Sequence, residues 1–323
     1  MTARSWLARW AELVPLQDRI ALVSPPHLVT KFARYAWAGR SRIVPAEDLA
    51  ARDPRFVSLV VDLARALGER YFRLELEGVE NLPARGGALL VGNHNGGLVP
   101  LEPFFTMVAA WDRFGPDRAV YALAHDFLFD DPMLRGYAGK LGALRAKPAG
   151  AKRALEAGHL ALVYPGGDLD AFRPFRDRWK IELGGRTGFV ELALRTRVPI
   201  VPVVTAGAHE QFIVLSRGDR AAARLHLHEW ARVVVLPIVL AVPWGVTIGF
   251  VPYLPLPAQI SMRITEPMSW PHLPAEAADD PAVVRRVYDE VEARMQATLD
   301  DMRVGRRFLL GRQAVARPAV AAM

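Results

Sequence analysis

A histidine followed by a glycine-rich turn is the feature of this sequence best suited to acid–base chemistry. Residues 88–91 form a short apolar run that predicts a buried strand, and the segment GNHNGG at residues 92–97 follows it directly. Glycine lacks a Cβ, so the backbone here can adopt unusual dihedral angles and approach a ligand closely. A neutral imidazole at a strand end can accept the proton of an attacking hydroxyl. We therefore interpret His94 as a general base.

The chemistry of His94 requires two kinds of partner. Its second ring nitrogen needs an acceptor that fixes the tautomer, and an oxyanion that forms during the reaction needs hydrogen-bond donors. A helix predicted over residues 100–112 begins just after the turn, so its N-terminal amides can face an anion. Backbone amides or Arg145 could therefore stabilise the oxyanion.

Three further short blocks follow the histidine block along the chain. They are GALR at residues 142–145, VYPGGD at 163–168 and VPIVPV at 198–203. Both glycine-rich turns come after predicted strands, and sites in open α/β sheets form at the carboxyl ends of the strands. Together, the four blocks support a catalytic role for His94 more strongly than its position alone.

In this order and spacing the four blocks resemble the glycerolipid acyltransferase superfamily, with its lysophosphatidate acyltransferases and its diacylglycerol acyltransferase branch, over residues 75–270. The resemblance implies direct transfer of a fatty acyl group from acyl-CoA or acyl-carrier protein to a glycerolipid hydroxyl. A lysophospholipid, a monoacylglycerol or a diacylglycerol could be the acceptor. The resemblance implies no cofactor, no metal and no covalent enzyme intermediate. The competing interpretation is a non-catalytic lipid-binding or lipid-transfer protein derived from an acyltransferase.

The chain departs from the family pattern at the carboxylate that orients the histidine. The family has His-x4-Asp, but Val99 occupies that position here, and the nearest acid downstream is Glu102. We interpret Glu102 as the orienting acid, brought into place by a longer turn, with Asp126 and Asp168 as alternatives. An acid in the first turn of a helix also interacts favourably with the helix dipole, which is the simpler explanation for Glu102.

The third block also differs from the usual family form. It reads Pro-Gly-Gly, as in the diacylglycerol acyltransferase branch, so the glutamate and arginine of Pro-Glu-Gly-Thr-Arg are missing. Arg173 is a candidate to replace the lost charge, or else a solvated surface arginine. Arg145 matches the arginine that the family uses for an acceptor phosphate. The candidate substrate-binding residues are Asn93, Gly96, Gly97, Arg145, Pro165, Gly166, Gly167, Asp168 and Arg173.

Strand and helix patterns alternate through the middle of the chain. Helices are predicted at residues 54–70, 100–112, 150–158, 185–196 and 281–303, and strands at 71–83, 88–91, 119–124, 160–165, 198–204 and 261–267. This rhythm predicts an α/β domain with a mostly parallel central sheet flanked by helices. The expected divisions are an N-terminal helical, membrane-interface segment at 1–53, the acyltransferase domain at 54–304 and a flexible basic tail at 305–323.

Two segments are candidates for membrane contact. Residues 1–53 carry tryptophans beside arginines in short amphipathic patterns, which suit a membrane interface, although packing on the domain would explain them equally well. Residues 233–262 contain no charged residue, but prolines and glycines interrupt them repeatedly. We interpret this run as a non-spanning apolar element that docks on a membrane or forms the wall of a lipid tunnel. A buried core segment is the alternative.

Composition limits the partners that we expect. The net charge of +7 favours an anionic partner such as lipid or a phosphate-bearing substrate, and no basic run with interleaved aromatics suggests nucleic acid. The absence of cysteine excludes disulfides and thiolate metal sites, and we expect no metal site. Charged residues interrupt the first thirty residues, so no signal peptide is predicted. We expect a peripheral or monotopic protein on the cytoplasmic face of a membrane, not a secreted one.

Overall fold

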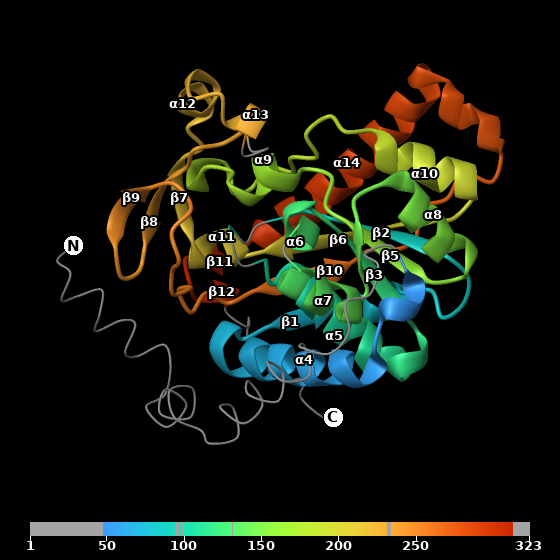
Figure 1. Cartoon of the computed structure of the whole chain (residues 1–323), viewed down its shortest axis with the longest axis horizontal. Helices are drawn as coiled ribbons and strands as arrows, with labels where there is room; N and C mark the ends of the chain where they lie inside the picture. Colours follow the sequence, from blue (N-terminus) through green and yellow to red (C-terminus); the bar gives the residue numbers. More distant parts are fainter. Residues whose placement is uncertain (1–47, 95–96, 98–99, 131, 231–233, 313–323) are drawn as a thin grey trace, which may run out of the picture.

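A seven-stranded sheet forms the centre of the protein (Figure 1). The computed structural model describes residues 48–94, 97, 100–130, 132–230 and 234–312. The strand order is β1-β10-β6-β2-β5-β3-β4, in which the last five strands are parallel and β10 runs antiparallel to β6. These strands are β1 (Glu75–Glu77), β2 (Ala88–Gly92), β3 (Val120–Ala124), β4 (Ala143–Arg145), β5 (Leu160–Val163), β6 (Ile200–Ala206) and β10 (Ser261–Ile264). The predicted α/β fold with a mostly parallel sheet is confirmed.

Helices cover both faces of this sheet. Those of the described residues are α4 (Pro54–Leu67), α5 (Glu102–Phe114), α6 (Phe127–Asp130), α7 (Pro132–Leu141), α8 (Pro148–Glu156), α9 (Gly167–Ala171), α10 (Gly188–Thr196), α11 (Ala208–Gln211), α12 (Asp219–Arg224), α13 (Leu227–Trp230) and α14 (Pro281–Arg303). Along β2, Ala88 and Leu90 join the apolar cluster of α4 and α5, whereas Leu89 and Val91 join that of α10 and α14. Burial on both faces explains why β2 reads as a continuous apolar run.

The first predicted strand is shorter than its sequence pattern suggests. Residues Gly68–Phe72 extend α4 as a π-helical turn, and only Glu75–Glu77 pair with β10. The reason is burial of Phe72, whose ring contacts that of Phe105 at a centroid distance of 6.2 Å. Arg73 then adopts a left-handed conformation with φ of 45°, which redirects the chain into the sheet.

The C-terminal segment expected to be a flexible tail is partly folded onto the domain. The strands β11 (Arg306–Arg307) and β12 (Gly311–Arg312) form a small hairpin. Arg306 is almost fully buried, where it forms an ion pair of 3.1 Å with Glu210 and donates a hydrogen bond to Gln259. The folded domain therefore extends to residue 312, and residues 313–323 lie outside the described part of the chain.

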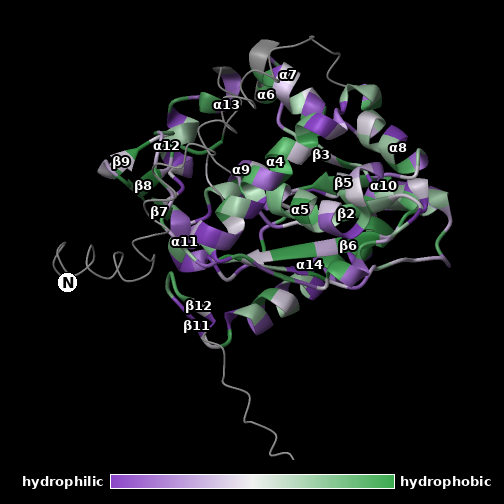
Figure 2. Cartoon of the chain, turned by 90° about the horizontal axis from the view of Figure 1, so that it is seen from below, coloured by the Kyte–Doolittle hydropathy of each residue, from purple (hydrophilic) through white to green (hydrophobic). Residues whose placement is uncertain are grey.

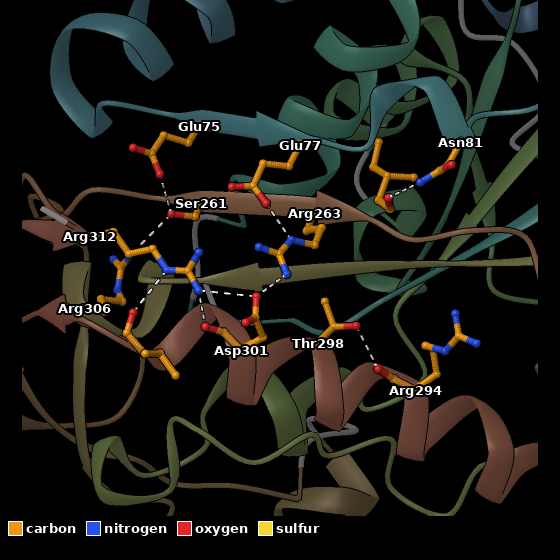
Figure 3. Close-up of polar contacts among 12 residues, drawn as sticks. Glu75, Glu77, Asn81, Ser261, Arg263, Arg294, Thr298, Asp301, Arg306 and Arg312 are labelled. Atoms are coloured by element: carbon orange, nitrogen blue, oxygen red, sulfur yellow. Dashed lines mark hydrogen bonds and ion pairs between the residues drawn. The ribbon is translucent and has the colours of Figure 1, made fainter. Parts of the chain in front are cut away.

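Charged side chains connect this hairpin, α14 and one edge of the sheet (Figure 3). Arg263 of β10 lies between Glu77 of β1 and Asp301 of α14, at 2.6 Å from each carboxylate. Arg312 forms a second ion pair with Asp301 at 3.4 Å. The predicted amphipathic helix at 281–303 is confirmed, and its polar side is thus joined to the sheet edge.

The uncharged run at residues 233–262 contains two short strands and the start of β10, joined by irregular segments. A second, antiparallel sheet contains β7 (Ile213–Ser216), β8 (Ile238–Ala241) and β9 (Gly245–Ile248). Within the described part of the chain, no helix combines the length and apolarity that a membrane crossing requires. The N-terminal segment expected at a membrane interface lies outside the described residues, except for 48–53.

Candidate active site

The candidate site lies where the parallel strands end. β2 is the middle strand of the seven-stranded sheet, between β6 and β5, so His94 follows a central strand and lies beside the turns after both neighbours. The Pro-Gly-Gly block follows β5, and Gly207 follows β6. Because these strands are parallel, their carboxyl ends meet at one edge of the sheet, as expected for sites in such folds.

Glu102 is the carboxylate that faces the His94 ring. It is the first residue of α5 and is fully buried, and its Oε2 lies 3.7 Å from Nδ1 of His94. A carboxylate at Nδ1 favours the tautomer in which Nδ1 carries the proton and Nε2 can accept one. Burial lowers the pKa of His94, but Glu102 and Asp170 raise it, and the net shift is upward. The alternative acids have other partners: Asp126 pairs with Arg145, and Asp168 pairs with Arg186.

An aromatic ring packs against the ring of His94. The ring of Tyr164, directly after β5, lies 4.9 Å from the His94 ring between centroids. Gly92 makes this packing possible, since a Cβ there would lie 2.4 Å from the tyrosine ring. Burial raises the pKa of Tyr164 well above its usual value, so its hydroxyl keeps its proton.

Asn93 has a different environment from the one expected for a substrate-binding residue. Its side chain is fully buried and forms two hydrogen bonds with the backbone of Thr205, at 3.0 and 2.8 Å. These bonds join the end of β2 to β6. The side chain therefore fixes the loop that carries His94.

Asp170 is a site residue that the sequence analysis did not identify. It lies in α9, is fully buried, and accepts a hydrogen bond from the backbone N–H of His94. Its other oxygen lies 3.1 Å from the guanidinium of Arg173, which in turn lies 2.8 Å from Nε2 of His209. Arg173 is therefore a buried residue within this chain of contacts and not a solvated surface arginine.

The charge states along this chain follow from burial. Burial raises the pKa of Asp170 to about 6, although Arg173 and His94 act in the opposite direction. Burial and the charge of Arg173 hold the pKa of His209 well below its usual value, so its ring is neutral and accepts from the guanidinium. A buried cation flanked by a carboxylate and a neutral ring has the partners that such a charge requires.

Replacing Asp170 by Asn is expected to change how stability depends on pH. The pKa of Asp170 is about 6 in the folded protein and near 3.8 in the unfolded chain, so folding favours its protonated form between these values. That contribution is complete below about pH 4 and is lost as the pH rises through about 6. Urea denaturation should therefore show the stability difference between wild type and Asp170→Asn falling by about 2–3 kcal/mol over this interval. A constant difference would contradict the assignment.

Close packing and backbone conformation explain the two glycines of the Pro-Gly-Gly block. A Cβ on Gly166 would lie 2.0 Å from the carbonyl oxygen of Glu182, and Gly167 begins α9 with a φ of 52°. Arg186 donates to the carbonyl of Pro165 at 2.9 Å and pairs with Asp168 at 3.3 Å. The block therefore shapes the turn that brings α9, and with it Asp170, to His94.

Within the glycine turn after His94, the structure describes Gly97. Gly97 has a φ of 60° and packs so closely on Phe212 that a Cβ would lie 2.5 Å from the ring. The requirement for glycine here therefore comes from a buried aromatic ring of the neighbouring segment. Gly96 and Val99 lie outside the described residues.

Arg145 lies away from His94 and has acidic partners of its own. It ends β4, three strand positions from β2, which corresponds to about 14 Å across a sheet. Its guanidinium lies 2.8 Å from Asp126 and 3.6 Å from Asp130. The structure therefore brings Glu102, Tyr164 and Asp170 to the histidine, whereas Arg145 lies at the outer end of the same sheet edge.

Comparisons with known proteins agree with this geometry. A family model described as Acyltransferase matches residues 73–206. An uncharacterized protein of Mycobacterium tuberculosis is 35% identical over 256 residues, which cover 79% of this chain and 69% of that protein. The chain belongs to the glycerolipid acyltransferase superfamily.

Two further proteins match at lower sequence identity. The human "DGAT1/2-independent enzyme synthesizing storage lipids" is 29% identical over 138 residues, which cover 43% of this chain and 41% of that enzyme. Among solved structures, the 1-acyl-sn-glycerophosphate (LPA) acyltransferase PlsC from Thermotoga maritima matches with a TM-score of 0.49 and 16% identity. That match covers 86% of this chain and 90% of that chain.

Proposed function

We propose that this acyltransferase transfers a fatty acyl group from acyl-CoA or acyl-carrier protein to a hydroxyl of a glycerolipid at the cytoplasmic face of a membrane. The observation that carries the proposal is the pair formed by His94 and the buried carboxylate of Glu102, 3.7 Å apart at the end of a central strand. A lysophospholipid, a monoacylglycerol or a diacylglycerol would supply the hydroxyl.

The proposed reaction needs only the side chains of this site and its two substrates. Nε2 of His94 removes the proton of the acceptor hydroxyl as its oxygen attacks the thioester carbonyl. The carbon–sulfur bond of the resulting tetrahedral oxyanion then breaks, and the leaving thiolate takes the proton from the imidazolium. Glu102 stabilises the imidazolium, in the way that a buried aspartate does in a serine protease triad.

Acyl transfer in mixed micelles tests this function. The purified chain is incubated with radiolabelled acyl-CoA or acyl-carrier protein and, in parallel, with lysophosphatidate, other lysophospholipids, monoacylglycerols and diacylglycerols. We expect labelled product from at least one acceptor class, which also identifies the acceptor. If no acceptor is labelled with either donor while lipid still binds, the lipid-binding alternative replaces the enzyme.

A further inference from the structure

The outer face of the β7–β8–β9 sheet is apolar where a solvated sheet is usually polar. The strand register places Leu240 opposite Val246 and Ile238 opposite Ile248 on this face. Leu240, Val246 and Ile248 are 42%, 65% and 62% exposed. An antiparallel sheet with one face on a core normally alternates apolar residues inside with polar residues outside. The outer side chains therefore have the character of a second buried face.

The inner face of the same sheet already accounts for its packing on the domain. Val214, Val239 and Ala241 join a buried cluster with Phe172 and Phe212. On the outer face, Ile213, which pairs with Leu240, packs on the buried Leu256, Ala258 and Leu309. Leu240, Val246 and Ile248 remain exposed to water, which is unfavourable. A contiguous exposed apolar patch on a folded protein indicates a surface that contacts another apolar phase.

The residues next to this face are also suited to a lipid interface. Trp244, at the turn between β8 and β9, is 60% exposed and donates its indole N–H to the carbonyl of Pro252 at 2.5 Å. Leu254, two residues after Pro252, is another large apolar side chain, and it is 64% exposed. Tryptophan is enriched where membranes meet water because its ring is apolar and its N–H is polar.

Two exposed arginines lie on α12, beside this sheet. The segment between them and β7 contains Arg217, whose side chain is paired with Asp219 at 2.9 Å. Arg220 and Arg224 follow on α12, which lies beside the β7–β8–β9 sheet in both views of the fold (Figures 1 and 2). An uncharged apolar surface with arginines beside it matches the acyl chains and anionic headgroups of a bilayer.

We propose that the protein lies on an anionic lipid bilayer through the outer face of the β7–β8–β9 sheet, with the α12 arginines at the headgroups. The location relative to the site supports a bilayer over a protein partner. The inner side of the sheet contacts the catalytic loop through Phe212, whose ring packs on Gly97. The bilayer would then lie one sheet layer, about 10 Å, from that loop. Only this last step rests on the proposed function, because it assumes that the acceptor is a membrane lipid.

A single introduced cysteine tests the contact directly, because the chain contains none. Val246→Cys in the full chain is labelled with an environment-sensitive fluorophore and mixed with vesicles of phosphatidylcholine alone or with phosphatidylglycerol. The matched control is Val304→Cys, at a position 69% exposed after α14. We expect a blue shift, and quenching by spin-labelled lipid, only at position 246 and more strongly with the anionic vesicles.

Vesicle cosedimentation of the double variant Val246→Glu/Ile248→Glu provides a second measurement. We expect partitioning to fall by about 10–100-fold, with thermal unfolding unchanged because both side chains are exposed. Val304→Glu should bind as the wild type does. The proposal is overturned if the wild type does not bind vesicles, or if position 246 is unshifted on bound protein. It is also overturned if the fluorophore is blue-shifted before lipid is added, since residues 1–47 or a second copy would then cover the face.

These measurements use no acyl donor, so their failure is separate from a failure of the proposed function. Loss of vesicle binding together with full transfer to a monomeric short-chain acceptor would place the defect at the membrane. Loss of transfer with normal vesicle binding would place it in the chemistry.

Discussion

A His94→Ala protein is expected to fold normally and to lose about 10³–10⁴-fold in kcat/KM for acyl transfer. This magnitude is the contribution of a positioned general base at the upper end of its usual range. Among the described residues that contact His94, Tyr164 keeps its own proton, and the carboxylates of Glu102 and Asp170 are fully buried. The hydrogen bond to Asp170 uses the backbone N–H of residue 94, so it survives the substitution.

The control for this experiment is His159→Ala. His159 directly precedes β5, at the amino end of the sheet, and its ring contacts that of Tyr121 at 5.3 Å between centroids. The control should retain wild-type kcat/KM. Steady-state rates with the best acceptor from the panel measure both variants, and turnover by His94→Ala within tenfold of wild type would remove the general-base assignment.

Glu102→Gln should lower kcat/KM by about 10²–10⁴-fold and also move the acidic limb of the pH–rate profile to lower pH. The rate loss follows because an amide no longer stabilises the imidazolium; the same change in a serine protease triad has an effect at the upper end of this range. The reaction needs neutral His94, so the rate rises with pH through its pKa. Removing Glu102 takes away the stronger of the two charges that raise this pKa and leaves the burial that lowers it.

Glu191→Gln separates this role from a simple helix-dipole effect. Glu191 is also an acid in the first turn of a helix, α10, where it accepts a hydrogen bond from Thr187 at 2.9 Å. If Glu102 served only the helix dipole, both variants would lose at most about 1 kcal/mol of stability and neither would shift the limb. We expect the limb to move in Glu102→Gln alone, as measured by kcat/KM between pH 5 and 9.

The sequence alone was sufficient for the features that depend on local pattern. Apolar runs predicted the parallel strands β2, β3, β5 and β6, and the spacing in residues 281–303 predicted α14. The three-residue strand β4 was not predicted, because so short a segment carries no clear pattern. The four blocks indicated the superfamily and pointed to His94 and Glu102, because a short loop limits which nearby acid can reach the histidine. The strand predicted at residues 71–83 was too long, because alternation cannot show that Phe72 turns into the core.

The tertiary structure decided every contact between distant segments. Asp170 lies 76 residues from His94 and His209 lies 36 from Arg173, and neither distance leaves a periodic signal in the sequence. Gly207 and His209, directly after β6, were the sequence signal that could have indicated a further site residue. Only the strand order shows that this turn lies beside β2. Arg173, which the sequence left as a possible surface arginine, is likewise buried, and it contacts both Asp170 and His209. Local pattern determines which elements form, whereas side chains meet only after the chain has packed, because contact depends on topology and not on spacing along the sequence.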